Sequence, residues 1–562
     1  MQEEVKISNI FWKRTYLFIE YESKKEQVIS LARLKKNVEI DRKTKEEKIS
    51  YEILNEHVLE TKQIEENKYR CKINITIAEG RSILEDGNWK VIIDHNPLAR
   101  PTVSDEVMLT IEDYSRVFRY GQNFYAYVVT FNIDKLIIDG EEKISIGFFA
   151  NYMRTNRRPF KHNYIDAFIE TKKFKKRLRK IFFVTAKGML NLYYQIISHL
   201  TPKRQKRILI MSENRVKIMD NLEAIDNRLK ERGLDKEFKI SYSFRNIFDG
   251  KLQNPFEWLA VITKVARNGY IFVDDYVPLF AFLKLHKKTT LVQTWHAGFG
   301  FKLVGYGRFG IKGSPRPRTS SHRQYTYGLI GNENLKEIYS EVWGIEKEAL
   351  LPTGMPRLEH FLDKDNMDKK IEEFYQSYPQ LKGKTIITFA PTYRGSSQTE
   401  AYYDYDKIDF DKLYKYCKET NSAVAFGKHH FIKQEIPIKE EHKDLIFDMS
   451  HYKLNDLFYV TDILITDYSS CFYDFLLLNR PVLFFVYDKA YYSATRGVHR
   501  PIEKVAPGKV CETFEQLLKA LYEKDYGEKE KKDFLVDNCV SNKKLASDQV
   551  IDYILLGKKD SI

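Results

Sequence analysis

Two histidines lie where an apolar run of the sequence gives way to a loop-like stretch. His296 follows the run 291–294 and precedes several glycines, and His429 follows the run that ends at Phe426. Glycine lets a substrate approach the backbone closely, and an imidazole exchanges protons near neutral pH. His296 could therefore take a proton from a hydroxyl group. The alternatives are that His296 is a packed core residue beside Trp295 and that His429 belongs to a basic surface cluster.

A second group of residues could bind phosphate. An apolar run ends in Thr466-Asp467-Tyr468-Ser469-Ser470, and the residues from Cys471 to Leu478 predict a helix. A helix N-terminus presents free backbone N–H groups and the positive end of its dipole to an anion. Ser469 and Ser470 add hydroxyl donors there, although both serines suit ordinary helix caps equally well.

Thr392 and Arg394 follow another expected strand, 386–389, which Pro391 ends. An arginine at this place could grip a pyrophosphate through two parallel hydrogen bonds. Alone, the sequence Pro-Thr-Tyr-Arg-Gly is only a turn. Together with the serines it would form the opposite wall of a phosphate pocket.

Several charged residues near these apolar runs could have more than one role. Asp467 would orient Arg394 or a serine hydroxyl, or cap the helix, and Arg496 is a further candidate cation for the phosphate pocket. Asp274-Asp275 follows an apolar run and could in principle hold Mg²⁺, yet carboxylates in such loops are more often solvated or capping. We therefore expect charge neutralisation by Arg, Lys, His and the helix dipole, with no required metal ion and no other cofactor.

These residues need a scaffold that brings the ends of several strands together. From residue 208 onward, short apolar runs alternate with helical stretches, as at 208–211, 270–273, 290–293, 386–389 and 423–426. This α/β pattern predicts parallel sheets covered by helices, and two such sheets in series predict two Rossmann-like lobes, residues 208–360 and 361–562. Ligands bind in the clefts of such folds, so the candidate residues are expected to meet there.

The first 207 residues have a different pattern. Residues 1–160 carry short β-branched and aromatic runs between polar turns, which predicts a small β-sandwich accessory domain. Residues 161–207 predict a basic amphipathic linker, in which apolar residues at helical spacing follow the cluster Lys172, Lys173, Lys175, Lys176 and Arg177. Such a helix can lie on an anionic membrane surface. The alternative is a solvated helix that connects two domains.

Composition narrows the class of protein. A chain of 562 residues needs two or three domains, and 43% hydrophobic residues can fill several cores. Its five cysteines lack metal-ligand or paired spacing, which favours reduced cytosolic thiols. The acidic N-terminus is not a signal peptide, and no window of about 18 apolar residues predicts a membrane span. The formal net charge of +14 calls for an anionic partner: lipid head groups, a polyphosphate chain or nucleic acid.

An ordered set of short motifs carries a resemblance to a known family. The motifs are 293–298 (Gln-Thr-Trp-His-Ala-Gly), 353–357 (Thr-Gly-Met-Pro-Arg), 389–395 (Phe-Ala-Pro-Thr-Tyr-Arg-Gly), 428–431 (Lys-His-His-Phe), 467–470 (Asp-Tyr-Ser-Ser) and the stretch from Tyr487-Asp488 to Gly497. Together they resemble the CDP-glycerol/CDP-ribitol polyolphosphotransferase family of teichoic acid synthesis. The Trp295-His296-Ala297 stretch, with Phe301-Lys302 and Gly305, is most similar to the ribitol-phosphate polymerases of wall teichoic acid.

The resemblance implies a glycosyltransferase-B-like fold and roles for individual residues. His296 matches the family's general base, and His429 matches its second motif histidine, which contacts the donor's phosphates or assists the leaving group. The resemblance also implies that Thr392, Arg394, Ser469 and Ser470 line the donor phosphate pocket. The chain departs from the family at the residue after this second histidine, where proline is usual and His430 stands here. His430 either shares the role of His429 or only occupies the place of the proline.

The resulting hypothesis is a peripheral enzyme at the cytoplasmic face of the cell membrane. It would transfer ribitol phosphate from CDP-ribitol to a lipid-linked teichoic acid chain and release CMP. One alternative uses CDP-glycerol with the same residues, and another is a sugar-nucleotide glycosyltransferase, because fold does not fix function. A third alternative belongs to a different functional class: a non-enzymatic protein whose basic linker binds nucleic acid or polyphosphate. The linker shows neither aromatic platforms nor a helix-turn-helix, so we expect no nucleic-acid partner.

Overall fold

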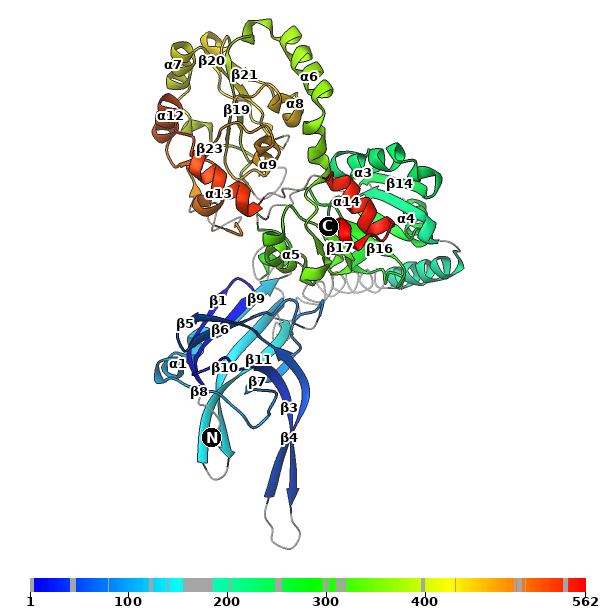
Figure 1. The fold of residues 1–562 in the computed structure, drawn as a ribbon, viewed down its shortest axis with the longest axis vertical. Helices are drawn as coiled ribbons and strands as arrows, with labels where there is room; N and C mark the ends of the chain where they lie inside the picture. The colour runs from blue at the N-terminus through cyan, green and yellow to red at the C-terminus, as the bar shows by residue number, and fades with distance from the viewer. Residues whose placement is uncertain are drawn as a thin grey trace, which may run out of the picture.

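The computed structural model shows three bodies that follow one another along its long axis (Figure 1). An N-terminal β region lies at one end, a first parallel sheet in the middle and a second parallel sheet at the other end. The described residues are 5–40, 47–78, 80–120, 125–138, 141–154, 185–201, 204–247, 255–296, 300, 303–309, 315, 320–395, 400–429, 431–489, 492, 498–500, 502–538 and 544–562.

The β region consists of two sheets that share one hydrophobic core. Their strand orders are β5-β6-β2-β1-β8 and β4-β3-β7-β11-β10-β9. The strands are β1 Lys6–Lys13, β2 Tyr16–Glu22, β3 Ile29–Ile40, β4 Glu47–Val58, β5 Glu60–Glu65, β6 Lys68–Asn74, β7 Gly87–Ile93, β8 Thr102–Val103, β9 Arg116–Tyr120, β10 Tyr125–Ile138 and β11 Glu141–Arg154, and α1 covers Asp105–Leu109. Because side chains alternate along a strand, β6 buries Tyr69 and Cys71 on its inner face.

The first parallel sheet has the order β13-β14-β12-β15-β16-β17-β18, in which the short edge strand β13 runs antiparallel to β14. Its elements are β12 Arg207–Ser212, β13 Asn214–Arg215, α3 Asp220–Glu231, β14 Lys239–Asn246, α4 Pro255–Arg267, β15 Tyr270–Val273, β16 Thr290–Gln293, η6 Gly305–Arg308, β17 Tyr327–Leu329, α5 Lys336–Trp343, β18 Leu350–Leu351 and η10 Pro356–Leu362. Residues 208–212 of β12 are all buried, as expected for a strand that helices cover on both faces.

The second parallel sheet has the order β21-β20-β19-β22-β23-β24. Its strands are β19 Thr385–Ala390, β20 Ser422–Phe426, β21 Ile446–Asp448, β22 Ile463–Thr466, β23 Val482–Phe485 and β24 Lys509–Cys511. The helices are α6 Lys364–Ser377, α7 Phe410–Thr420, α8 Leu454–Phe458, α9 Cys471–Leu476, α11 Ile502–Val505, α12 Phe514–Glu523 and α13 Glu528–Asn538, followed by α14 Ala546–Val550 and the π-helical turn η15 Ile551–Leu555. Since these strands run parallel, their carboxyl ends meet at one edge.

The last helix of the chain returns to the first parallel sheet. Val550 and its neighbours in α14 and η15 share a core with Leu222 of α3. Arg232 of α3 donates from Nη2 to Asp552 at 2.7 Å. In Figure 1 the red α14 accordingly lies beside α3 and away from the second sheet.

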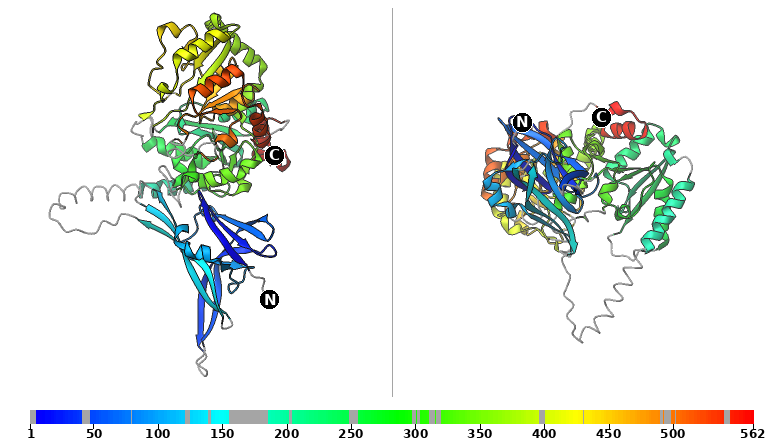
Figure 2. Two further views of the ribbon diagram at one scale, coloured as in Figure 1. Left: turned by 90° about the vertical axis from the view of Figure 1, so that its left-hand side faces the viewer. Right: turned by 90° about the horizontal axis from the view of Figure 1, so that it is seen from below.

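The β region is joined to the first parallel sheet by shared packing (Figure 2). Tyr306 and Phe309, in and after η6, belong to the hydrophobic core of the β region. The ring of Phe309 stacks on that of Phe118 with centroids 5.1 Å apart. Arg323 donates from Nη2 to the carbonyl of Thr76 at 2.5 Å. The two bodies are therefore fixed to each other by both apolar and polar contacts.

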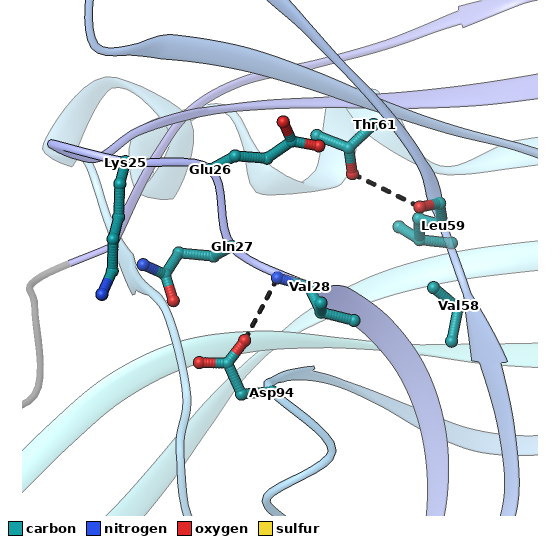
Figure 3. A pocket seen from close by; sticks show the side chains of 8 residues that line it. All are labelled: Lys25, Glu26, Gln27, Val28, Val58, Leu59, Thr61 and Asp94. Carbon is teal, nitrogen blue, oxygen red and sulfur yellow. Dashed lines mark hydrogen bonds between the residues drawn. The ribbon is translucent and has the colours of Figure 1, made fainter.

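An open hollow of about 590 Å³ lies on the β region (Figure 3). It is lined by Lys25, Glu26, Gln27, Val28, Val58, Leu59, Thr61 and Asp94. The backbone N–H of Val28 donates to Asp94 at 3.2 Å across it. No predicted site residue that the structure describes lines this hollow, so it is separate from the site below.

The predicted mixed α/β class is confirmed, with several sheets in one chain. The five basic residues predicted to contact a membrane, 172–173 and 175–177, lie outside the described residues. Residues 185–200 of the same predicted linker are helical. Within the described ranges, no helix is long and apolar enough to cross a membrane.

Candidate active site

A cleft of about 460 Å³ is lined by residues from the loops and helices that surround both parallel sheets. The first half contributes Arg215, Asp220, Trp295, His296, Gly300, Val304, Tyr339, Val342 and Arg357. The second half contributes His429, Leu454, Asn455, Ser469, Ser470, Cys471, Tyr473, Asp474 and His499. The structure therefore brings four of the predicted site residues, two histidines and two serines, to one place.

His296 lies on a tight turn directly after β16. The preceding residue, Trp295, has a φ of 45°, a left-handed conformation that is costly for a bulky side chain. Two hydrogen bonds hold this turn: the backbone N–H of Trp295 donates to Gln293 at 2.9 Å, and Asn221 donates to the carbonyl of Thr294 at 2.9 Å. The imidazole of His296 stacks on the indole at 4.6 Å and its side chain is 44% exposed.

Asp275 lies beside His296, with 4.0 Å between its Oδ2 and Nδ1 of the ring. The sequence suggested that this aspartate is a solvated or capping carboxylate or, less often, a metal ligand. The structure gives it another neighbour because β15 and β16 pair in parallel with Val273 opposite Gln293, so the residues after each strand come together. The backbone N–H of Tyr276 holds the carboxylate at 2.6 Å. The pairing of these two strands was the signal from which this contact could have been predicted.

His429 follows β20 on the other side of the cleft. The backbone N–H of Phe431 donates to its Nδ1 at 3.2 Å, so the neutral ring carries its proton on Nε2. The ring of Tyr393 lies 5.0 Å away. His429 also lines a smaller hollow of about 230 Å³, together with Pro391, Lys428, Ser450 and Ser469 among others. His430 lies outside the described residues.

Ser469 and Ser470 follow β22 and are both half-buried. The backbone N–H of Cys471 donates to the Ser469 hydroxyl at 3.3 Å. Ser470 occupies the N-cap position of α9 but makes no side-chain capping bond. The helix that follows has six residues, 471–476, and is shorter than the sequence predicted.

Arg394 is buried in a network of carboxylates. It donates from Nη1 to Asp467 at 2.9 Å and from Nε and Nη2 to Asp488 at 2.6 and 2.8 Å. Its side chain is 4% exposed. Burial disfavours the charge, but Asp467 and Asp488 hold the pKa of Arg394 above its ordinary value.

This network ties together three turns at the carboxyl edge of the second sheet. Arg394 follows β19, Asp467 follows β22 and Asp488 follows β23. Of the three roles expected for Asp467, the structure shows the pairing with Arg394. Asp467 also accepts the backbone N–H of Thr392 at 2.8 Å. The arginine thus holds these turns together, and four of its five N–H donors are already bonded to Thr392, Asp467 and Asp488.

The Thr392 hydroxyl is buried and has no hydrogen-bond partner among the described residues. A buried hydroxyl without a partner is uncommon and points to a ligand or a water molecule. Arg496, the remaining predicted phosphate contact, lies outside the described residues.

An ion pair between Arg357 and Asp474 joins the two halves across the cleft. Nη2 of Arg357 lies 2.5 Å from Oδ1 of Asp474, and Nη1 bonds Oδ2. Burial raises the pKa of Asp474 against the opposing effect of Arg357. The backbone N–H of Arg357 donates to Asn221, the residue that also holds the His296 turn. This pair was missed from the sequence because its members are far apart in the chain.

No group of three or more His, Cys, Asp or Glu side chains in the described part of the chain is placed to hold a metal ion. The charged groups around the cleft are instead histidines, paired arginines and paired carboxylates. What this arrangement offers is a half-exposed imidazole beside a carboxylate on one side, with hydroxyls and a second imidazole on the other. It suits acid–base chemistry at a phosphate.

The fold is similar to that of the wall teichoic acid polymerase TagF. The TM-score is 0.51 at 22% sequence identity, over 70% of this chain and 99% of that chain. A TagF variant soaked with CDPG gives a TM-score of 0.53 over 69% of this chain and 98% of that chain, also at 22% identity. At this identity the likeness concerns the fold alone.

Residues 192–556 match the family described as CDP-Glycerol:Poly(glycerophosphate) glycerophosphotransferase. The chain belongs to this family, and the predicted resemblance is confirmed. The teichoic acid ribitol-phosphate polymerase TarL of Staphylococcus aureus (strain NCTC 8325 / PS 47) is 28% identical over 554 residues, 94% of this chain and 95% of that protein. The polymerase TarK of the same organism is 34% identical over 354 residues, 62% of this chain and 68% of that protein.

Proposed function

We propose that this protein transfers ribitol phosphate from CDP-ribitol to the terminal hydroxyl of a lipid-linked teichoic acid chain and releases CMP. The observation that carries the proposal is the single cleft in which His296 lies with His429, Ser469 and Ser470. Similarity to TarL over nearly the whole of both chains supports the ribitol donor. CDP-glycerol, used with the same residues, is the alternative donor.

In the proposed mechanism His296 is the general base. It takes the proton of the acceptor hydroxyl while that oxygen attacks the phosphorus that carries the ribitol. Asp275, 4.0 Å from Nδ1, would stabilise the imidazolium that forms. A new P–O bond to the acceptor forms as the bridging P–O bond to CMP breaks. The Nε2–H of His429 would donate to the departing phosphate and offset its developing charge.

The donor phosphates would lie between the serines and the Arg394 network. Ser469, Ser470 and the buried hydroxyl of Thr392 supply uncharged donors. Arg394 and Asp467 hold the turns from which these donors project, and Arg496 completes the set as a predicted cation. We infer that the smaller hollow beside His429 accommodates another part of the CDP-polyol, because it shares His429 and Ser469 with the cleft.

We assign the two parallel sheets to two Rossmann-like lobes in a glycosyltransferase-B-like arrangement. Residues 208–360 would form the acceptor side and residues 361–562 the donor side, behind a β-sandwich domain of residues 1–160. The position of His296 after β16 and of the serines after β22 supports this division. Residues 546–555 would complete the core of the acceptor lobe, as their packing on α3 suggests.

An assay of CMP release tests the function. With a short teichoic acid acceptor, we expect CDP-ribitol to be used more efficiently than CDP-glycerol by roughly tenfold or more in kcat/KM, because the site would contact the extra hydroxyls. A sugar nucleotide should release no nucleotide above background. If CDP-glycerol is turned over faster than CDP-ribitol, the proposed donor is CDP-glycerol. If only the sugar nucleotide is turned over, the proposed function is wrong.

We further propose that the enzyme lies on an anionic membrane surface at the cytoplasmic face. The helix that covers residues 185–200 buries one face against the first parallel sheet, with Tyr194 fully buried. Its opposite face exposes a stripe of four apolar residues at helical spacing: Met189, Leu192, Ile196 and Leu200, which are 67%, 62%, 50% and 74% exposed. A stripe of this kind lowers its free energy by entering the interfacial layer of a bilayer.

Basic residues lie next to this stripe. The loop 284–288 contacts the helix through Gln195, which donates to the carbonyl of Lys284 at 2.6 Å, and through the rings of His199 and His286, 5.1 Å apart. Lys284, Lys287 and Lys288 of the loop are exposed, and neither the helix nor the loop contains an acidic residue. The predicted contacts Lys172, Lys173, Lys175, Lys176 and Arg177 precede the helix in sequence. This charge suits anionic head groups.

Vesicle sedimentation tests the membrane contact. Replacing Leu192 and Ile196 by asparagine should lower binding to vesicles containing anionic phospholipid by about tenfold or more, because both side chains would leave the apolar layer. Neutralising the five predicted basic residues should lower binding further, with an effect that fades as salt rises. Leu54→Asn, on an exposed strand of the β region, is the matched control. Unchanged binding of both variants at low ionic strength would leave the helix as a solvated connector.

A further inference from the structure

Arg14 connects the β region to both halves of the molecule. It lies in the turn between β1 and β2 with a φ of 55°. Its Nε and Nη2 each lie 2.9 Å from an oxygen of Glu341, and its Nη1 lies 2.5 Å from the carbonyl oxygen of His499. Each guanidinium nitrogen therefore has a partner outside the β region.

Both partners of Arg14 belong to the walls of the cleft. Glu341 is buried on α5, the helix that gives Tyr339 and Val342 to the cleft. His499 lines the cleft itself, from the segment that connects β23 and β24 of the second sheet. A side chain of the N-terminal β region thus fixes two cleft-forming segments that are 158 positions apart in sequence, at 341 and 499.

The imidazole of His499 is buried and makes no hydrogen bond to any residue that the structure describes. The residue is 4% exposed, and neither ring nitrogen has a partner in the described part of the structure. The ring packs closely over Gly307, where a Cβ atom would lie 2.7 Å from its Cε1. Glycine at 307 is therefore needed for the ring to occupy this position beside the loop 303–309. A buried imidazole whose two nitrogens lack partners is costly unless a ligand supplies them.

The charge state of the His499 ring limits which functional groups of a ligand could bind it. Burial, followed by the nearby Arg14 and Arg500, lowers the pKa of His499 well below its ordinary value. The ring is therefore neutral at neutral pH, with one donor and one acceptor nitrogen. A hydroxyl group, which both donates and accepts, complements it. A phosphate only accepts and would favour a cation.

The location of the His499 ring in the cleft indicates which of the two substrates, donor or acceptor, it would contact. Gly307, over which the ring packs, lies on the chain segment that follows His296, and Gly300 and Val304 of this segment line the cleft with the proposed base. The hydroxyls that lie on this side in the proposed mechanism are those of the acceptor. The serines and the Arg394 network, which would hold the donor, belong to the turns after β19, β22 and β23, and the chain reaches His499 eleven residues beyond Asp488 of the last of these turns.

We propose that His499 binds a hydroxyl of the acceptor polyol chain, and that Arg14 is a positioning residue that holds His499 in place from the β region. This inference rests on the function proposed above. It gives the N-terminal β region a part in substrate recognition, since its hairpin turn would set the geometry of an acceptor subsite.

Kinetics of His499→Phe test the inference. The variant keeps a ring of similar size but removes both polar nitrogens, so we expect the KM for a teichoic acid acceptor to rise about tenfold. The KM for the CDP-polyol should change less than twofold. His442→Phe is the matched control: His442 is also buried and its Nδ1 also lacks a partner, but it does not line the cleft. An unchanged acceptor KM in His499→Phe would overturn the proposal. A water molecule would then be the partner of the ring nitrogens.

A second variant tests Arg14 without leaving a buried charge. In Arg14→Gln/Glu341→Gln both partners become neutral, so the fold should persist, as thermal unfolding would show. The acceptor KM should rise as in His499→Phe, and adding His499→Phe to this pair should raise it little further, because the changes act through one group. Fully multiplicative effects would show that Arg14 acts independently of His499 and would refute the positioning role.

Measurements on the wild-type protein distinguish failure of this inference from failure of the proposed function. Acceptor-dependent CMP release by the wild type supports the function before any variant is made. If the wild type shows it and the His499 variant keeps the wild-type acceptor KM, only the present inference fails. If the wild type releases no CMP from any CDP-polyol, the proposed function fails and the inference fails with it.

Discussion

Replacing His296 by alanine is expected to lower the rate of transfer at saturating substrates by about 10²–10⁴-fold. The proposed base takes up the acceptor proton in the transition state, whereas it contributes little to binding of the donor in the ground state. The affinity for CDP-ribitol, measured by calorimetry, should therefore stay within about twofold of the wild type. The structure strengthens this expectation because the ring is half-exposed in the cleft and has Asp275 beside it.

The control for this variant is His95→Ala, which removes an exposed histidine of the β region that pairs with Glu56. Its rate should match the wild type. Asp275→Asn should reduce the rate less than His296→Ala does, since it leaves the base in place and removes only the neighbouring charge. A wild-type kcat for His296→Ala across the neutral pH range would show that another group is the base.

Replacing Arg394 by methionine is expected to destabilise the protein by about 3–5 kcal/mol. The change removes a buried cation and leaves Asp467 and Asp488 without the charge that offsets their burial. The turn that carries Thr392 would lose its support at the same time, so the affinity for CDP-ribitol should fall by about tenfold or more in the fraction that folds. Chemical denaturation measures the first effect and calorimetry the second.

Arg480 offers a matched control for Arg394. It also donates to turns of the second sheet, but its partners are the backbone carbonyls of Phe458, Tyr459 and Thr461, so its loss leaves no buried carboxylate. Arg480→Met should cost about 1–2 kcal/mol and leave donor binding unchanged. Equal stability losses for the two arginines would argue against the buried charge network as the cause. Unchanged donor affinity in Arg394→Met would remove this network from the donor pocket.

Local patterns predicted the strands of the α/β region well. The alternation of buried runs and helical stretches predicted an α/β chain, and the structure has parallel sheets there. His296, His429, Ser469 and Ser470 each follow a strand, and parallel strands bring their carboxyl ends to one edge. Their meeting in one cleft could therefore be expected from the sequence.

Contacts between distant segments could not be predicted in this way. Asp474 appeared only as a polar residue within a helix, and nothing local indicates that Arg357 lies against it. The same holds for Asp488, which pairs with Arg394 in a buried network. Such ion pairs depend on which distant segments pack together in the folded protein. A single sequence contains no periodic pattern that indicates these contacts.

The return of α14 to the first parallel sheet has a consequence for synthesis of the protein. The ribosome makes the strands of the first sheet long before it makes residues 546–555, yet these late residues fill the core beside Leu222. The earlier half therefore waits with apolar surface uncovered while the second sheet is made. A chain that ends before residue 546 would keep this surface exposed and would be a substrate for chaperones and proteases. The cleft would thus be complete only after both halves have been translated.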